Sequence, residues 1–184
     1  VYNKLQQAHA EAYPEEASIE NFLDDGAGTG NFIGRINDRV DISNLHAIDF
    51  NQYALDVLKE RYGKMPNLHP KQMDATQLDF KEDYFDGVSM INVLYAIPNY
   101  QRALSEISRV TRPGTIITIS GPVKAADIPY ALARSKEELQ RSGKYDEVKR
   151  DWDIVEAVNM QILGKAEGTH QFEPSALSSE LENQ

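Results

Sequence analysis

The chain has 184 residues, 41% of them hydrophobic, and carries 29 acidic against 19 basic residues for a formal net charge of -10. This length and composition are typical of one globular domain, and the negative charge argues against nucleic acid as a partner because it would repel a phosphate backbone. The absence of cysteine excludes disulfides, thiolate metal sites and a cysteine nucleophile, and a cytoplasmic location is expected.

Membrane and metal partners are not expected either. No apolar run reaches the roughly 18 to 20 residues that span a bilayer. The four histidines are scattered and lack the spacing of a metal site such as H-E-x-x-H. Two of them, His46 and His69, fall inside expected strands, where a structural role is favoured. Because the chain begins at Val1, its ends are not expected to be native.

Strand and helix patterns alternate after a weak helical stripe over residues 1–13. The expected strands are residues 21–24, 45–49, 68–73, 85–91 and 115–120, and the expected helices are 31–40, 52–62 and 99–111. Residues 112–114 are expected to end the helix before the last strand, whose β-branched residues predict burial on both faces. The alternation predicts an α/β fold, a doubly wound, mainly parallel Rossmann-like sheet with helices on both faces.

The pattern becomes helical from residue 123, with expected helices at 130–141 and 146–163 and one more after Pro174. The second helix carries an apolar stripe that includes Val148, Trp152 and Val155. Packing against the core is the favoured interpretation of this stripe. A lid over the ligand-binding edge of the sheet is the alternative.

The segment 22–31, FLDDGAGTGN, is the most informative motif of the chain. It predicts a strand that ends on carboxylates and continues into a glycine-rich turn at the start of a helix. Glycine leaves the backbone open to a ligand, and the free N–H groups of the helix point to the same place. A carboxylate at the strand end favours a ligand with an ammonium or sulfonium group over a phosphate.

Polar residues also follow the other expected strands. Asp24, Asp49, Asp74 and Asn92 all fall at strand ends. Ligands of parallel α/β sheets bind beyond the carboxyl ends of the strands. We therefore expect these residues to converge on one binding edge.

A nicotinamide dinucleotide fold also ends its second strand on an acid that binds ribose. Its fingerprint is G-x-G-x-x-G, but the last position is Asn31 when counted from Gly26 and Ile33 when counted from Gly28. Neither register fits. An NAD(P)-dependent oxidoreductase remains as the alternative function.

Residues 21–120 resemble class I S-adenosylmethionine-dependent methyltransferases of the small-molecule type. The resemblance rests on five motifs in order, at residues 23–30, 47–51, 74–76, 85–98 and 103–114. It implies S-adenosyl-L-methionine as the cofactor, with Asp49 accepting hydrogen bonds from the ribose hydroxyls, Asp74 meeting the adenine amino group and Phe50 packing on the ring. The cofactor-binding residues that it implies are Asp24, Gly26, Ala27, Gly28, Gly30, Asp49, Phe50, Asp74, Ala75, Thr76 and Asn92.

The implied reaction is methyl transfer to a small-molecule acceptor by in-line displacement. Tyr95, after the fourth expected strand, is a weak candidate for a catalytic residue, with core packing as its alternative. The acceptor and the oligomeric state stay open, and a non-catalytic S-adenosylmethionine-binding protein of the same fold is a further alternative.

The chain departs from the resemblance in two respects. Asp25 stands where the family usually has an apolar residue, so it is either exposed or serves this protein specifically. The final antiparallel strand pair of the family is not readable in residues 165–184 and is expected to be absent. We expect a single domain over 1–184, with an N-terminal helix in 1–18, the cofactor-binding core in 19–122, and a helical insert or lid with a truncated C-terminal part in 123–184.

Overall fold

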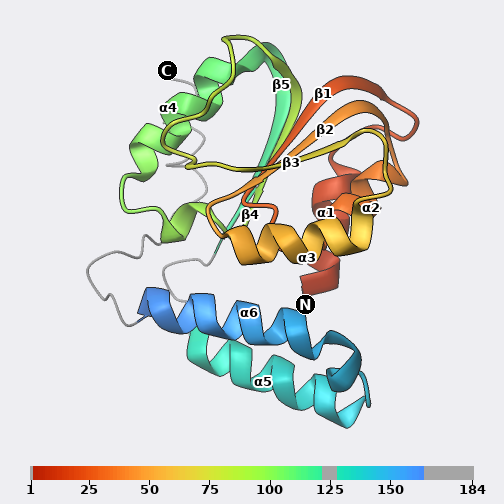
Figure 1. The fold of residues 1–184 in the computed structure, drawn as a ribbon, viewed down its shortest axis with the longest axis vertical. Helices are drawn as coiled ribbons and strands as arrows, with labels where there is room; N and C mark the ends of the chain where they lie inside the picture. The colour runs from red at the N-terminus through yellow and green to blue at the C-terminus, as the bar shows by residue number, and fades with distance from the viewer. Residues whose placement is uncertain (1, 122–127, 164–184) are drawn as a thin grey trace.

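The computed structural model describes residues 2–121 and 128–163. Five parallel strands form one sheet in the order β3-β2-β1-β4-β5, with helices on both faces (Figure 1). The strands are β1 (Ser18–Asp25), β2 (Asp41–Asp49), β3 (Leu68–Gln72), β4 (Phe85–Ile91) and β5 (Thr111–Ser120). The helices are α1 (Tyr2–Glu11), α2 (Ile33–Asn37), α3 (Gln52–Tyr62), the 3-10 turn η1 (Leu94–Ala96), α4 (Tyr100–Val110), α5 (Ile128–Arg141) and α6 (Tyr145–Leu163). This architecture confirms the predicted α/β fold.

Apolar layers cover the two faces of the sheet. One layer lies under α1, α2 and α3 and includes Phe22 and Leu55, and the other lies under α4 and includes Leu23 and Ile107. Successive residues of a strand point to opposite faces, so neighbours in β1 contribute to different layers. Each fully buried side chain of this size stabilises the fold by roughly 1.5–3 kcal/mol.

The boundaries of two elements were predicted accurately because their sequence signals are local and strong. The structure confirms β4 and α3 at the predicted residues. The side chain of Asn51 caps α3 by accepting a 3.0 Å hydrogen bond from the amide of Tyr53. Gly63 follows the helix with an ordinary φ of -62°, and a Cβ there would lie 2.4 Å from the carbonyl oxygen of Lys59. A larger residue would therefore clash with the last turn.

The helix expected over residues 31–40 is wrong in length, because α2 covers only Ile33–Asn37. Gly34, Asn37 and Asp38 are weak helix formers, and the chain turns at Asp38 into a longer β2. Strand β1 is also longer than expected and ends on Asp25 instead of Asp24. Both carboxylates therefore belong to the strand.

Helix α4 ends at Val110, before residues 112–114 as predicted, but the start of β5 at residue 115 and the burial of both its faces are wrong predictions. The strand begins at Thr111, directly after α4, and Gly114 takes a φ of +82° where the register with β4 shifts. Such an irregularity lets pairing with β4 resume after a local bend, as a β-bulge does. β5 is an edge strand among the described residues, and Ile116 is 39% exposed.

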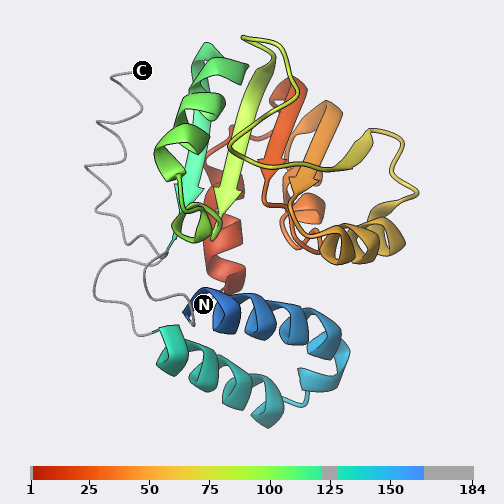
Figure 2. The same cartoon turned by 60° about the vertical axis from the view of Figure 1, so that its left-hand side comes forward.

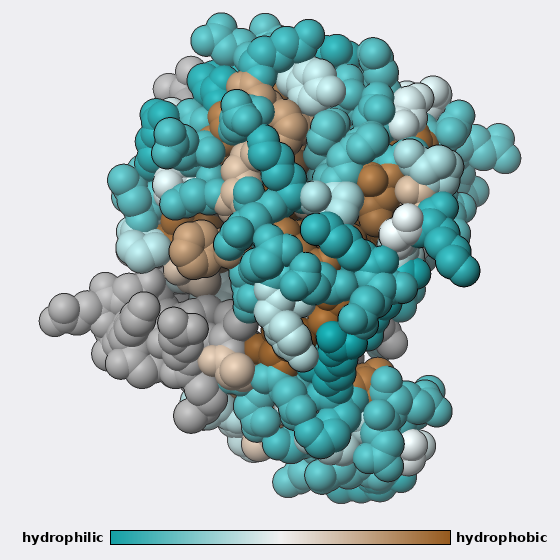
Figure 3. All heavy atoms as spheres, in the orientation of Figure 1, coloured by the Kyte–Doolittle hydropathy of each residue, from teal (hydrophilic) through white to brown (hydrophobic). Residues whose placement is uncertain are grey.

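Helices α5 and α6 form a hairpin beyond the carboxyl ends of the strands (Figure 2). α6 docks on α3, because Arg150 pairs with Glu60 and lies 5.5 Å from the ring of Tyr53, and Arg61 pairs with Asp151. Trp152 is buried, and Figure 3 shows hydrophobic residues where the hairpin meets the rest of the molecule. Trp152 of the α6 stripe thus packs as favoured, while Val148 and Val155 are half-buried, and the hairpin lies over the predicted binding edge.

Some expectations have no counterpart in the described structure. The helix after Pro174 and the absence of a final hairpin concern residues outside the described part of the chain. Among the helices of residues 2–121 and 128–163, none has the length and apolar character needed to cross a bilayer.

Candidate functional site

The glycine-rich turn is attached to the end of β2. The amides of Gly26 and Ala27 donate to the carbonyl oxygen of Ile48 at 2.8 and 2.9 Å. The amide of Gly28 donates to Oδ2 of Asp49 at 2.8 Å. These bonds place the turn and the Asp49 carboxylate side by side, as the sequence predicted for the binding edge.

Asp49 is partly buried, and both of its carboxylate oxygens accept hydrogen bonds from backbone amides. Its Oδ1 accepts a 2.7 Å hydrogen bond from the amide of Asn51. Burial raises the pKa of Asp49, while the amides of Asn51 and Gly28 act in the opposite direction. Each carboxylate oxygen has a second lone pair, so Asp49 can also accept hydrogen bonds from the hydroxyls of a ligand.

The three glycines of the turn meet different surroundings. A Cβ on Gly26 would lie 2.0 Å from the Val93 side chain, so glycine lets β1 approach the loop after β4. A Cβ on Gly30 would press on Tyr62 and Leu58 of α3 at 3.0–3.1 Å. Gly28 has no atom within 4 Å of that position. Gly28 is therefore the open point of the turn, where a ligand can approach the backbone.

Asp24 lies on the face covered by α1, α2 and α3 and is 2% exposed. The Ser89 hydroxyl donates to its Oδ1 at 2.7 Å, and Oδ2 has no partner among the described residues. Burial raises the pKa of Asp24 to about 7, the Ser89 hydroxyl lowers it in part, and the charge of Asp49 raises it further. Ser89 was not singled out from the sequence, although a lone hydroxyl in an apolar strand was the available signal.

Asp25 is the last residue of β1 and is also only 2% exposed. This excludes the interpretation that it is exposed. Burial raises the pKa of Asp25 to about 8, and the charges of Asp24, Asp49 and Asp74 raise it as well. Its Oδ2 has no hydrogen-bond partner in the described part of the chain.

The remaining predicted cofactor residues lie in the loops after β2, β3 and β4. Phe50 is 76% exposed, so it is not part of the buried core. Its ring offers a flat apolar surface next to Asp49. Asp74 is exposed, and its Oδ1 accepts from the amide and hydroxyl of Thr76 at 2.8 Å each. Ala75 is buried in the α4 layer. Asn92 directly follows β4 with a φ of +57°, and its amide donates to the carbonyl oxygen of Ser120 at 2.9 Å.

Tyr95, the weak catalytic candidate, lies in η1 and is 5% exposed. Its ring borders the end of β5, because a Cβ on Gly121 would lie 3.8 Å from its Cδ1. Packing therefore accounts for this side chain. Its part in a reaction stays a prediction.

Arg61 is a site neighbour that the sequence did not reveal. Its Nη1 donates to the carbonyl oxygen and hydroxyl of Thr29 at 3.4 Å and to Oδ1 of Asn31 at 3.2 Å, while Nη2 pairs with Asp151 of α6. One side chain thus joins the glycine-rich turn to the helical hairpin. An arginine on a solvated helix face carries no local signal of such a role.

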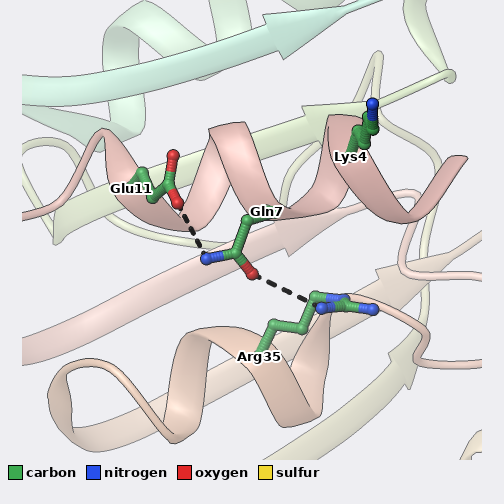
Figure 4. Close-up of a pocket in the computed structure, with 4 residues that line it drawn as sticks. All are labelled: Lys4, Gln7, Glu11 and Arg35. Atoms are coloured by element: carbon green, nitrogen blue, oxygen red, sulfur yellow. Dashed lines mark hydrogen bonds between the residues drawn. The ribbon is translucent and has the colours of Figure 1, made fainter. Parts of the chain in front are cut away.

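Other parts of the molecule offer less. A polar hollow between α1 and α2 is lined by Lys4, Gln7, Glu11 and Arg35, where Gln7 donates to Glu11 at 2.9 Å (Figure 4). None of the predicted site residues lines it. Residues 2–121 and 128–163 contain no group of His, Cys, Asp and Glu suited to a metal ion.

Of the two strand histidines, His46 packs in the structure. Its ring lies 5.1 Å from that of His69 on the neighbouring strand and contacts Phe80 and Phe85 of the α4 layer. Burial lowers the pKa of His46 to about 4. His46 thus has the structural role predicted for it, whereas His69 is exposed on β3.

The family model "Methyltransferase domain" matches residues 23–119, more than half of the chain. The chain belongs to this methyltransferase family. A demethylmenaquinone methyltransferase of Staphylococcus aureus strain MRSA252 is 30% identical over 166 residues, which is 76% of this chain and 68% of the relative. A phosphatidylethanolamine N-methyltransferase of Cereibacter sphaeroides is 32% identical over 127 residues, covering 64% of this chain and 60% of that protein.

Solved structures agree on the methyltransferase fold. An S-adenosylmethionine-dependent methyltransferase from Mesorhizobium loti has a TM-score of 0.57 at 19% identity, covering 64% of this chain and 53% of that one. The [4+2]-cyclase SpnF has a TM-score of 0.60 at 24% identity, covering 67% of this chain and 46% of that one. At this identity the likeness shows the fold alone. The chain spans only about half of either structure.

The residues of the binding edge fit S-adenosylmethionine, which is also the cofactor that the family match indicates. Gly28 leaves the backbone open, Asp49 can accept from the two ribose hydroxyls, and Phe50 offers a surface to a planar base. The carboxylates at the edge favour the positive end of the cofactor. No basic side chain pairs with Asp24, Asp25 or Asp49 among the described residues, which fits a cation better than a phosphate.

Proposed function

We propose that this chain catalyses S-adenosylmethionine-dependent methyl transfer to a small-molecule acceptor. One observation carries the proposal: the Asp49 carboxylate, hydrogen-bonded to the amide of Gly28 at 2.8 Å, lies directly before the exposed ring of Phe50. This arrangement supplies acceptors for a ribose and a surface for a base at one point of the sheet edge. The family match over residues 23–119 supports the same reaction class.

When bound, the cofactor supplies a methyl group on a positively charged sulfur, which is a good leaving group. The contribution of the chain is then mainly alignment, and proximity can supply roughly 7–11 kcal/mol of the barrier. Asp49 and the open backbone at Gly28 would orient the nucleoside. The α5–α6 hairpin, docked over the carboxyl ends through Arg61 and Arg150, would help exclude water from the acceptor side.

The acceptor class is taken from the relatives. Two of them are named for demethylmenaquinone and phosphatidylethanolamine, which are small molecules with long apolar chains. We propose that the acceptor of this chain belongs to the same chemical class, and we assign neither compound to it. An interaction of Tyr95 with the acceptor, the cytoplasmic location and the division of 1–184 into a core and a helical lid remain predictions.

The test is calorimetric titration with S-adenosylhomocysteine, the product that the cofactor leaves. Asp49→Ala should weaken binding by at least roughly tenfold, because hydrogen bonds to a charged group contribute about 1.5–3 kcal/mol each. Asp79→Ala removes a surface carboxylate paired only with Lys71 and serves as the matched control. Equal affinity in both variants would contradict the assignment of Asp49.

Two alternative functions give different results in a thermal-shift experiment. An NAD(P)-dependent oxidoreductase would be stabilised by reduced nicotinamide dinucleotide and not by S-adenosylhomocysteine, since only a bound ligand raises the melting temperature. A non-catalytic binding protein would be stabilised by S-adenosylhomocysteine, yet would transfer no methyl group to quinol or aminolipid acceptors. Turnover with either acceptor class supports the proposal and identifies the class.

A further inference from the structure

We propose that Asp25 is a specificity-determining residue that reads the adenine edge of the cofactor with a neutral carboxyl group, its C=O accepting from the amino group and its O–H donating to a ring nitrogen. The proposal rests on the function proposed above. It goes further by assigning a ligand contact to the one motif residue that the methyltransferase resemblance leaves unexplained.

The position of Asp25 differs from that of Asp24 by one strand residue and hence by one face of the sheet. Asp25 is paired in register with Ile48 of β2, and Ile48 belongs to the apolar layer under α4. Leu23, two residues earlier on the same face, packs in that layer. The apolar layer under α4 ends at the carboxyl end of β1. The binding edge with the open turn at Gly28 begins at the same point. Asp25 is therefore the residue of β1 that meets the edge from the α4 side.

The carboxyl group of Asp25 is buried without a complete set of partners. It is 2% exposed, and its Oδ2 has no hydrogen-bond partner among the described residues. A buried polar atom left unsatisfied destabilises a fold, so native structures rarely keep one without a function or a bound partner. Ser89 satisfies one oxygen of neighbouring Asp24 at 2.7 Å, whereas no side chain of residues 2–121 and 128–163 does this for Oδ2 of Asp25.

The charges around Asp25 favour its neutral form. The groups that act on it are Asp24 of its own strand, Asp49 at the end of β2 and Asp74 in the loop after β3, all of them acidic. No ion pair joins it to a basic side chain in the described part of the chain. Burial and these charges raise its pKa to about 8.

A neutral carboxyl group has chemistry that an ionised one lacks. It presents one donor and one acceptor side by side, whereas a carboxylate only accepts. In adenine, the amino group presents the complementary donor and the adjacent ring nitrogen presents the acceptor. The amino group has two N–H bonds, so one of them remains for Asp74. The exposed ring of Phe50, after Asp49, provides a surface on which such a base can lie at the same edge.

The test compares wild type, Asp25→Asn and Asp25→Leu in calorimetric titrations with 5′-methylthioadenosine between pH 6.5 and 9.5. This probe has the adenine and ribose but no titrating α-amino group. Asparagine keeps a donor and an acceptor and does not ionise, while leucine fills the site with the apolar side chain typical of the family. Asp79→Ala, which removes a surface carboxylate that is paired with Lys71 and lies outside the five sequence motifs, is the control.

Wild type should bind about tenfold more weakly at pH 9 than at pH 7, since only the neutral fraction of a group with a pKa of about 8 is competent. Asp25→Asn should bind like wild type at pH 7 and lose this part of the pH dependence, which the surface variant Asp79→Ala should retain. Asp25→Leu should bind at least tenfold more weakly at pH 7.

Binding by Asp25→Leu equal to wild type, with the same pH profile, would overturn the proposal and leave Asp25 a structural residue. Melting curves recorded first show that each variant is folded. Failure of the wild type to bind both 5′-methylthioadenosine and S-adenosylhomocysteine would instead overturn the proposed function itself, so the two failures are distinguishable.

Discussion

The buried carboxyl of Asp25 predicts that the ligand-free protein becomes more stable when this residue is replaced by leucine, and more so at higher pH. Burial and the neighbouring acids raise the pKa of Asp25 from 3.8 to about 8 in the folded state. Between these values the folded protein holds a proton that the unfolded chain has released. The stability contributed by this group is therefore full below pH 3.8 and is lost as the pH rises toward 8.

The size of the effect follows from the two pKa values. Where only the folded state holds the proton, each pH unit lowers the free energy of unfolding by about 1.4 kcal/mol. From pH 5 to pH 8 the wild type should lose on the order of 4 kcal/mol through Asp25. Leucine does not titrate and packs with the apolar α4 layer, so the advantage of Asp25→Leu should grow by that amount over the same interval.

Urea unfolding of both proteins at pH 5 and pH 8, followed by circular dichroism, measures this change. Asp25→Asn serves as a second non-titrating variant that keeps the shape of the side chain, and it should show the same pH-dependent gain with a smaller pH-independent part. The Asp24 contribution is present in all three proteins and largely cancels. A difference between wild type and Asp25→Leu that is equal at the two pH values would refute the burial of an unpaired, proton-holding Asp25.

Two further predictions concern the packing around the site. Arg61→Leu leaves Asp151 of α6 without its partner, so amide exchange in the α5–α6 hairpin should accelerate in hydrogen-exchange mass spectrometry, whereas Arg150→Leu, which breaks a more exposed pair, should change it little. The Tyr13 hydroxyl bonds to the carbonyl of Val88 at 2.8 Å in the buried core, so Tyr13→Phe should lower the free energy of unfolding by roughly 1–3 kcal/mol in urea titrations, and an unchanged midpoint would contradict that bond.

The order of strands and helices could be predicted because the signals are local. Strand β4 is an apolar run between turn residues, and α3 is bounded by a capping Asn51 and by Gly63. The binding edge followed from a general rule on parallel sheets, which placed Asp49 and the glycine-rich turn together before any contact was known. Contacts within a few residues, and the rule that strands run parallel, were sufficient for this part.

Burial could not be predicted in the same way, because it depends on what the fold places next to a residue. The β-branched residues of β5 fit a central strand and an edge strand equally well, and Ile116 is exposed because no described strand covers that side. A second aspartate after Asp24 would be expected at the surface from its residue type alone. The pairing of Asp25 with Ile48 shows that the strand continues, and its 2% exposure shows that its side chain is enclosed.

Asp24 and Asp25 together show how one strand residue changes the use of the same chemical group. Both are 2% exposed, and burial raises the pKa of both. Asp24 lies on the face under α1, α2 and α3 beside Ser89 of β4, whose hydroxyl bonds to it at 2.7 Å, so part of its polar group is satisfied within the fold. Asp25 faces the layer under α4 at the point where that layer ends, and no protein donor reaches its free oxygen among the described residues. Since the fold leaves this second carboxyl incomplete at the binding edge, a bound ligand is the partner best placed to complete it.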